Sequence, residues 1–260
     1  MIKLSGRTQP LEHYPVLDAL DVIHRLGFDG VEVCLETDEM APDKLTDEII
    51  ASVRERIETL GLAPHSVGYH RDYVYDDHEY ELTRRAIAAT RGFGTDLFIF
   101  SGPPKRTSDQ AEWDRMLART SELVNLGEKH GVILAQEFEP GFIVGSTAEL
   151  LRLFEELPSS HLAANADLGH LYLCDPDPIA SIHALGSKIV HGHVENMVTG
   201  VHDHVLPTEG DMDLERYFEA LHEIGFDGAL ALDLYKHDYE TVAPEQIAFL
   251  RSLIAAVEER

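Results

Sequence analysis

A local pattern that recurs along the chain limits the folds open to it: a helical segment ends at a glycine, and a short apolar run follows within a few residues. Its clearest copies are Leu26-Gly27-Phe28-Asp29-Gly30 before Val31-Glu32-Val33, Arg91-Gly92-Phe93-Gly94 before Leu97-Phe98-Ile99-Phe100, His130-Gly131 before Val132-Ile133-Leu134, and Ile224-Gly225-Phe226-Asp227-Gly228 before Ala229-Leu230-Ala231-Leu232. Glycine suits the left-handed residue that follows a helix, and near-continuous apolar strands are typical of a parallel sheet covered by helices. The pattern therefore predicts repeated helix–turn–strand units.

Eight such units are predicted over the length of the chain. The expected strands lie near residues 2–4, 30–34, 63–67, 97–101, 132–137, 162–167, 188–193 and 229–234, with helical patterns between them. Eight βα units in 260 residues are typical of a (β/α)8 TIM barrel, so we expect one α/β domain over residues 1–260. The rival is a doubly wound dinucleotide-binding fold, which is weakened because no strand is followed by a Gly-x-Gly-x-x-Gly turn.

The charge balance excludes several kinds of partner. The chain has 21 Lys and Arg against 47 Asp and Glu, a formal net charge of −26, which repels nucleic acid and anionic membranes. No apolar run approaches the roughly 18 residues of a membrane span, and the start lacks the apolar stretch of a secretory signal, so we expect a cytoplasmic protein. Cys34 and Cys174 are too few and too far apart to indicate a disulfide framework.

Carboxylates and imidazoles follow most of the predicted strands, and the carboxyl ends of strands are where (β/α)8 barrels gather catalytic groups. Any one of these residues could be a helix N-cap or a rim residue, but their coincidence indicates a site. A set of Asp, Glu and His without cysteine suits one divalent metal ion, namely Mn²⁺, Mg²⁺, Co²⁺ or Zn²⁺. The residues are His65 and His70 after the third strand, Glu137 and Glu139 after the fifth, Asp167 and His170 after the sixth, His191, His193 and Glu195 after the seventh, Asp233 after the eighth, and His202 and His204 between the last two strands.

These motifs resemble the xylose-isomerase-like barrels, a superfamily that includes the sugar phosphate isomerases and epimerases. The stretch Gly131-Val132-Ile133-Leu134-Ala135-Gln136-Glu137 is similar to the family's fifth strand with its Glu ligand, and Asn165-Ala166-Asp167-Leu168-Gly169-His170 to its Asp ligand followed by a substrate-contacting His. His191-Gly192-His193 resembles the His-x-His of the seventh strand, whose second His is a ligand. His204-Val205-Leu206-Pro207-Thr208-Glu209-Gly210-Asp211 is similar to the segment in which a His precedes a Gly-Glu-Gly-type turn, with Thr208 in place of the first Gly.

The resemblance covers the whole chain and implies a metal ion held by four side chains, Glu137, Asp167, His193 and Asp233. Position 233 departs from the family pattern, because the isomerases and epimerases usually have Glu there. The shorter side chain of Asp233 implies either that the strand sits closer to the metal or that a water intervenes.

Such a site is suited to isomerising or epimerising a small sugar, ketose or related polyol through an enediolate. A divalent cation polarises the carbonyl and neighbouring hydroxyl oxygens, and two carboxylates can remove and return the proton. The candidates for this proton transfer are Glu137 and Asp233, from the fifth and eighth strands. The expected substrate-binding residues are His65, His170, Glu139 and His204.

Several alternatives stay open at this point. A lyase of the inosose dehydratase type would use the same metal and base. A nuclease normally needs further histidines, and the fourth strand here ends at Ser101 instead. A non-catalytic barrel would be expected to have lost ligands, whereas all four positions hold competent side chains. No Arg/Lys cluster marks a phosphate pocket, so a free sugar is slightly favoured over a sugar phosphate, and related barrels often form dimers or tetramers, which leaves a homo-oligomer open.

Overall fold

Eight parallel strands pair in the order β1-β10-β7-β6-β5-β4-β3-β2 and close into a barrel in the computed structural model, which describes residues 1–259. The predicted (β/α)8 barrel is thereby confirmed, and the expected strands agree with the observed ones to within a few residues. The barrel strands are β1 (Lys3–Arg7), β2 (Gly30–Cys34), β3 (Ala63–Gly68), β4 (Leu97–Ser101), β5 (Ile133–Glu137), β6 (Leu162–Asp167), β7 (Ile189–Val194) and β10 (Ala229–Leu232).

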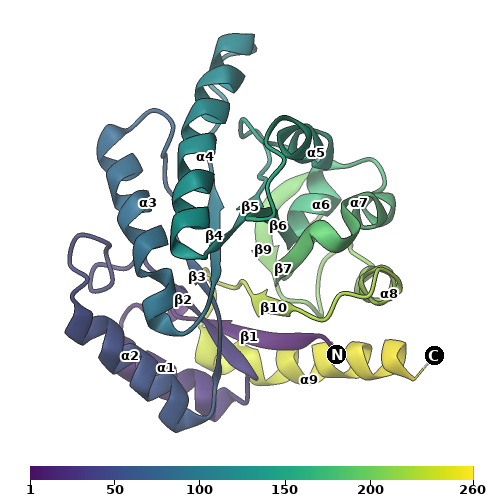
Figure 1. Ribbon diagram of the computed structural model, residues 1–260. Helices are drawn as coiled ribbons and strands as arrows, with labels where there is room; N and C mark the ends of the chain where they lie inside the picture. Colours follow the sequence, from purple (N-terminus) through teal and green to yellow (C-terminus); the bar gives the residue numbers. More distant parts are fainter. Residues whose placement is uncertain (260) are drawn as a thin grey trace.

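Helices lie outside the strands and cover the barrel, as Figure 1 shows. Helices α1, α2 and α4 end at Gly27, Gly61 and Gly131, each with a positive φ that glycine adopts without strain. The helices are α1 (Val16–Leu26), α2 (Asp47–Leu60), α3 (Asp77–Ala89), α4 (Gln110–His130), α5 (Thr147–Glu156), α6 (Leu168–Cys174), α7 (Pro178–Leu185), α8 (Leu214–Glu223) and α9 (Tyr239–Glu258), with short 3-10 turns η1 (Gln9–Leu11), η2 (Thr90–Phe93) and η3 (Gly186–Lys188).

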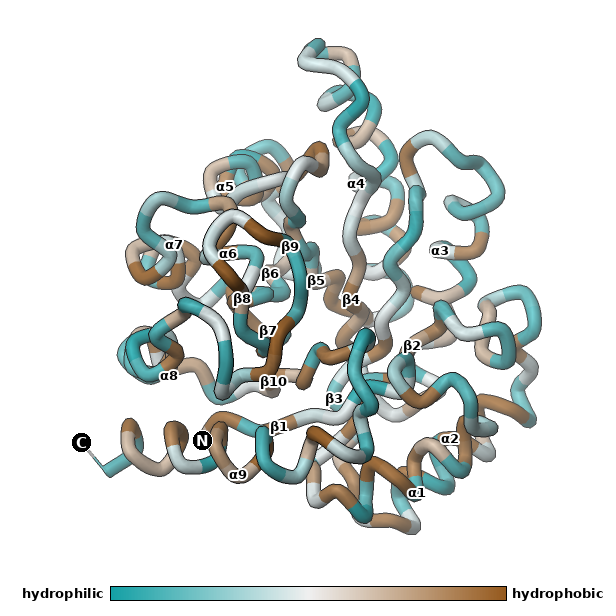
Figure 2. The backbone as a smooth tube through the Cα atoms, turned by 180° about the vertical axis from the view of Figure 1, so that it is seen from behind, coloured by the Kyte–Doolittle hydropathy of each residue, from teal (hydrophilic) through white to brown (hydrophobic). Residues whose placement is uncertain are grey.

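Apolar side chains fill the layer between the strands and the helices. Strands β2, β6 and β10 are buried along their whole length, as expected of parallel strands covered on both faces. Figure 2 shows the hydrophobic colour along β4 and β10. Leu20 and Ile23 of α1 are fully buried, and each such side chain contributes about 1.5–3 kcal/mol to folding. None of the helices within residues 1–259 is long and apolar enough to cross a membrane.

Two segments differ from the expectation. Strand β1 continues to Arg7, because the polar and glycine positions after Leu4 pair in register with Gly30, Val31 and Glu32 of β2 although they carry no apolar signal. After β7 the chain forms an antiparallel hairpin of β8 (Asn196–Val198) and β9 (Val201–Val205), where no strand was expected. The alternation of polar and apolar residues in this segment is too short to distinguish a hairpin from a loop.

The register of the barrel brings polar strand ends to one rim. Asp167 of β6 pairs with His193 of β7, and Ser101 of β4 pairs with Glu137 of β5. His193 also pairs with Ala231 of β10, two residues before Asp233. Because all eight strands run in the same direction, these side chains meet at the carboxyl end of the barrel.

We expect Gly127→Ala in α4 to destabilise the protein. A Cβ at this position would lie 2.4 Å from Leu134 Cδ1 and 2.8 Å from the Val132 carbonyl oxygen. Helix propensity favours Ala by roughly 1 kcal/mol, but overpacking costs about 1–3 kcal/mol, and the backbone oxygen cannot move aside. Urea unfolding should therefore give a lower free energy of unfolding. Asn125→Ala, at an exposed position of the same helix, is the control and should be neutral or slightly stabilising. A Gly127→Ala variant as stable as wild type would contradict this packing.

Candidate active site

The four predicted metal ligands converge around one imidazole. His193 Nδ1 lies 2.9 Å from Glu137 Oε2, 3.8 Å from Asp167 Oδ2 and 4.0 Å from Asp233 Oδ2. All four side chains are buried. They come from β5, β6, β7 and the residue that follows β10, so their meeting depends on closure of the barrel.

Asp167 has two roles, one for each carboxylate oxygen. Its Oδ1 accepts a hydrogen bond of 2.7 Å from the His170 backbone N–H and caps the amino end of α6. Its Oδ2 is buried and has no hydrogen-bond partner among the described residues. A buried, unpartnered carboxylate oxygen is costly unless a cation or a proton satisfies it.

Electrostatics at the centre favour positive charge. Burial alone raises the pKa of the Glu137 carboxyl, but His193, His70 and His170 more than offset this and hold its pKa below the ordinary value. Burial lowers the pKa of His193, yet the carboxylates of Glu137 and Glu32 raise it well above the usual range. Asn165 Nδ2 also donates a short hydrogen bond to Glu137. The surrounding carboxylates therefore stabilise a cation at the position that His193 Nδ1 faces.

The donor set fits a divalent metal ion. Ligand atoms of Asp167, His193 and Asp233 lie within 4.8 Å of one another, and so do those of Glu137, Asp167 and His170. Carboxylate oxygens and an imidazole nitrogen without thiolates suit Mn²⁺, Mg²⁺, Co²⁺ or Zn²⁺. Together with the unpartnered Asp167 Oδ2, this supports the four residues as its ligands.

Two charged residues at the centre of the site were not among the sequence-based candidates. Arg7 Nη1 lies 2.5 Å from Asp233 Oδ1, an ion pair without hydrogen-bond alignment, and Arg7 Nε donates a 2.9 Å hydrogen bond to Glu32 Oε1. Burial raises the pKa of Asp233, but Arg7, His204 and His193 bring it below the ordinary value. One feature of the sequence could have indicated this buried pair: Glu32 is a charged residue between the apolar Val31 and Val33 of a predicted strand.

A small cavity of about 170 Å³ opens beside these residues. It is smaller than the roughly 300–1,000 Å³ of pockets for drug-sized ligands, which is consistent with a small substrate. Its lining includes the predicted Glu137, His193, Asp233, Glu139, His170 and His204. It also includes His70 and His202, which were among the polar candidates near the strand ends but had no assigned role, and five residues that were not predicted: Arg7, Gln9, Glu36, Arg71 and Tyr235. A larger cavity of about 780 Å³ shares Glu36 with it but contains none of the predicted residues, so we assign the chemistry to the smaller one.

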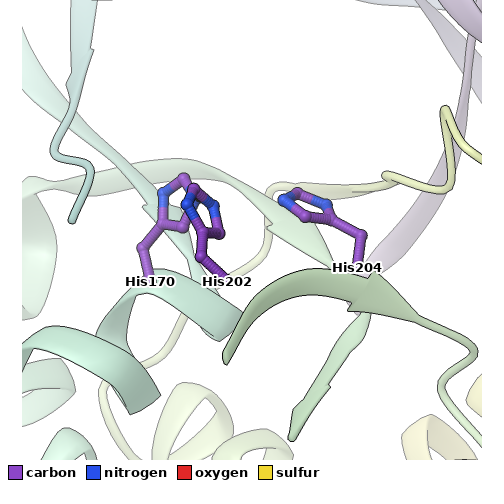
Figure 3. A group of neighbouring side chains, drawn as sticks. All are labelled: His170, His202 and His204. Carbon is purple, nitrogen blue, oxygen red and sulfur yellow. Dashed lines mark hydrogen bonds between the residues drawn. The ribbon is translucent and has the colours of Figure 1, made fainter. Parts of the chain in front are cut away.

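Three histidines form one side of the small cavity (Figure 3). His170 Nδ1 lies 2.9 Å from the Phe138 carbonyl oxygen, and His204 Nδ1 lies 3.0 Å from the Asp233 carbonyl oxygen. Because a carbonyl oxygen only accepts, each Nδ1 carries the proton. His170 Nε2 lies 3.0 Å from Nε2 of His202, which the β8–β9 hairpin supplies. The three ring nitrogens are close enough to bind substrate hydroxyls or a cation.

Glu139 lies beside Glu137 in the same cavity. Burial and the Glu137 charge raise the pKa of its carboxyl above the ordinary value, although His170 and His70 act in the opposite direction. A carboxyl group of this kind can act as an acid or as a hydrogen-bond donor to a substrate oxygen.

The structure does not bring His65 to the cavity, which corrects its assignment as a substrate-binding residue. Its ring lies near Gly30 and lines a different cavity with Lys3, Asp29 and Gly61, at the amino ends of the strands. The register between β2 and β3 shifts here: Val31 pairs with Pro64, but Glu32 pairs with Ser66. The shift turns Ser66 toward Glu32 in place of His65.

We expect Asp167→Asn and His193→Ala to lose tight binding of Mn²⁺ or Zn²⁺. Asn retains a capping oxygen for α6 but removes the charge, whereas His193→Ala removes the central nitrogen ligand. Titration calorimetry and metal analysis of the purified variants measure this loss. Asp96→Ala, an exposed carboxylate, is the control. Normal metal content in either variant would remove that residue from the ligand set.

A second pair of variants tests the corrected histidine. His65→Ala should leave metal affinity unchanged, because His65 lies away from the site. His70→Ala should weaken it or slow turnover, since His70 lies in the cavity and hydrogen-bonds Ser101 Oγ at 3.1 Å. Metal titration and thermal unfolding of both variants separate the two effects. Loss of metal from His65→Ala at unchanged Tm would restore His65 to the site.

Comparison with known proteins bears out the family resemblance. Residues 20–253 match the family model described as xylose isomerase-like TIM barrel. The L-ribulose-5-phosphate 3-epimerase UlaE of Escherichia coli is 26% identical over 242 residues, 88% of this chain and 85% of that protein. A solved structure of L-ribulose 3-epimerase has a TM-score of 0.83 at 18% identity, covering 100% of this chain and 96% of its own. The probable 3-DHS dehydratase AsbF of Bacillus anthracis has a TM-score of 0.83 at 16% identity, covering 96% and 99%. The chain therefore belongs to the xylose isomerase-like TIM-barrel family, in which its relatives include sugar epimerases.

Proposed function

We propose that this protein is a divalent-metal-dependent isomerase or epimerase that acts on a small sugar, ketose or related polyol. The observation that carries the proposal is the convergence of Glu137, Asp167 and Asp233 on His193 Nδ1 beside a cavity of about 170 Å³. The similarity to an L-ribulose-5-phosphate 3-epimerase supports the reaction class.

The reaction moves a proton on the carbon next to a carbonyl group, through an enediolate. The metal ion, when bound, supplies Lewis-acid stabilisation of the negative charge on the oxygens. The protein must then supply a base near that carbon and an acid that returns the proton. Glu137 and Asp233 are the candidates, because they come from nonadjacent strands and both border the cavity.

Neighbouring residues orient these two carboxylates. Asn165 Nδ2 donates to Glu137 Oε2, and Arg7 Nη1 holds Asp233 Oδ1 at 2.5 Å. Glu137 Oε2 is thereby held against His193 Nδ1, whereas Asp233 keeps its other oxygen, Oδ2, toward the centre. Asp233 Oδ2 lies 3.6 Å from His204 Nδ1. Arg7 and His204 thus hold the Asp233 carboxylate toward the centre, although its side chain is shorter than the Glu that is usual in the family.

Residues on the cavity wall would hold the substrate. His170 and His204 point ring nitrogens toward the cavity, and Glu139 adds a carboxyl group whose raised pKa favours donation to a substrate oxygen. His70 is a further candidate, because it lines the same cavity. These polar groups match the closely spaced hydroxyls of a sugar or polyol.

An unphosphorylated substrate agrees best with the charges near the site. Arg7 is held by Glu32 and Asp233. Of the cations considered for a phosphate, Arg106 pairs with Asp72 at 2.9 Å, and Lys236 pairs with Asp203 at 2.7 Å. A phosphate group at any of these three cations would have to displace a carboxylate, and it would meet a chain with a net charge of −26. Arg71, which also lines the cavity, donates to the carbonyl oxygens of His70 and Glu36 and is the cation at which a phosphate would be tested first.

A dehydratase is the second candidate, because the same base removes the same proton when a β-hydroxyl then leaves.

The experiment that tests the proposed function is a screen of ketoses, inososes and hydroxypyruvate in deuterated water with Mn²⁺ present. Deuterium incorporation without loss of water supports an isomerase or epimerase, and loss of water supports a dehydratase. Metal-bound protein that does neither with any of these substrates would contradict the proposal.

We expect Glu137→Gln and Asp233→Asn to lower deuterium exchange by about 10²–10⁴-fold at saturating metal, because each removes a basic carboxylate at nearly constant volume. Exchange rates measured by NMR over a range of Mn²⁺ concentrations separate lost metal from lost base. Asp203→Asn, an exposed carboxylate on the hairpin, is the control. If both neutral variants exchange as wild type does, the two carboxylates are ligands only, and the base is to be sought first at Glu139.

A further inference from the structure

We propose that Glu32 is a positioning residue for the metal centre: it accepts the Nε2–H of His193 and so presents the Nδ1 lone pair of the same ring to the cation. The proposal rests on the proposed function of the site as a metal centre. Neither the family resemblance nor the strand-end pattern assigned a role to Glu32.

The two nitrogens of His193 face different groups. Nδ1 faces Glu137 at 2.9 Å, on the side where the four ligands meet, whereas Nε2 lies 3.3 Å from Glu32 Oε2. Without a cation, the Glu137 carboxylate can only accept, so Nδ1 as well as Nε2 carries a proton and the ring is positively charged. A metal ion would take the place of the Nδ1 proton, and the neutral ring would then keep its one N–H on Nε2, facing Glu32. Asn165 Nδ2, which is only a donor, lies 3.3 Å from Nδ1, and this contact is favourable when Nδ1 carries no proton.

Glu32 is held rigidly as an acceptor. It is fully buried, with Oε1 accepting from Arg7 Nε at 2.9 Å and Oε2 accepting from Ser66 Oγ at 2.9 Å. An added Cβ on Gly68 would lie 3.1 Å from Oε1, so the carboxylate also packs closely against β3. A carboxylate fixed on three sides in this way can set the orientation and the tautomer of the ring it faces.

The arrangement is difficult to explain as a contribution to stability. Arg7, Glu32 and Asp233 bury an arginine and two carboxylates together, and buried ion pairs are often no more stabilising than apolar residues of similar volume. The same Arg7 that anchors Glu32 also holds Asp233 Oδ1. One buried guanidinium therefore orients two of the four ligands, His193 through Glu32 and Asp233 directly.

Glu32→Gln is the sharpest variant because it should reverse the tautomer while keeping the volume. Arg7 has only donors, so it fixes the amide oxygen of the new side chain at the former Oε1 position. The amide nitrogen then faces His193 Nε2, which must accept, and the proton moves to Nδ1. A similar reversal explains the effect of an amide in place of the aspartate of a Ser-His-Asp triad. Ser66→Ala is the matched control, because it removes the other donor to Oε2 and leaves the carboxylate in place.

The first readout is metal affinity, measured by competition with a chelator for Zn²⁺ and Mn²⁺. Glu32→Gln should bind about 10–100-fold more weakly than wild type, the usual effect of removing such a partner, and Ser66→Ala should bind nearly as wild type does. Circular dichroism and Tm confirm that the variants are folded. Wild-type affinity in folded Glu32→Gln would overturn the proposal, whereas absence of metal binding by wild type would instead contradict the metal centre itself.

The second readout needs no Glu32 variant and therefore holds even if that variant does not fold. Long-range ¹H–¹⁵N spectra of the Zn²⁺-loaded wild-type protein, with the His193 signals identified by their absence from His193→Gln, report which ring nitrogen carries the proton. We expect a protonated Nε2 and a metal-bound Nδ1. A metal-bound Nε2, or a protonated Nδ1, would overturn the proposal.

Discussion

The concentration of buried negative charge at one end of the barrel is the constraint on which the site depends. Glu137, Asp167 and Asp233 surround His193 with almost no access to water, and each would be costly without a compensating charge. The fold supplies part of that charge through Arg7 and through the imidazole itself. A divalent cation is the simplest group that can satisfy the remaining oxygens at once.

The barrel makes this concentration possible because its strands are parallel and closed. Each strand needs only one polar residue at its carboxyl end, after a run of apolar residues that the core accepts. For this reason the apolar runs were enough to predict the fold, and the polar residues near their ends indicated a site, while the resemblance to the xylose-isomerase-like barrels singled out Glu137, Asp167 and His193 among them as expected ligands. Asp233 was found in the same way, although its strand is short.

Other parts of the site were beyond reach of the sequence for identifiable reasons. Glu32 lies inside β2 and Arg7 ends β1 beyond the predicted strand, so their meeting depends on the register between β1 and β2. His65 was misplaced because the register between β2 and β3 shifts by one residue, which periodicity does not reveal. His202 was among the polar candidates, but its place in the cavity depends on a hairpin whose few residues carry no clear strand signal, so no role was assigned to it.

The double use of Asp167 limits how this protein can evolve. One oxygen caps α6 and the other faces the centre, so replacing the residue by any side chain without a capping oxygen also removes a helix cap worth roughly 0.5–2 kcal/mol. Glu137 caps no helix, and its contacts are all within the cavity region. If the centre holds the proposed metal ion, a change of metal preference is thus more accessible through position 137 than through position 167, where a substitution affects the helix cap as well as the site.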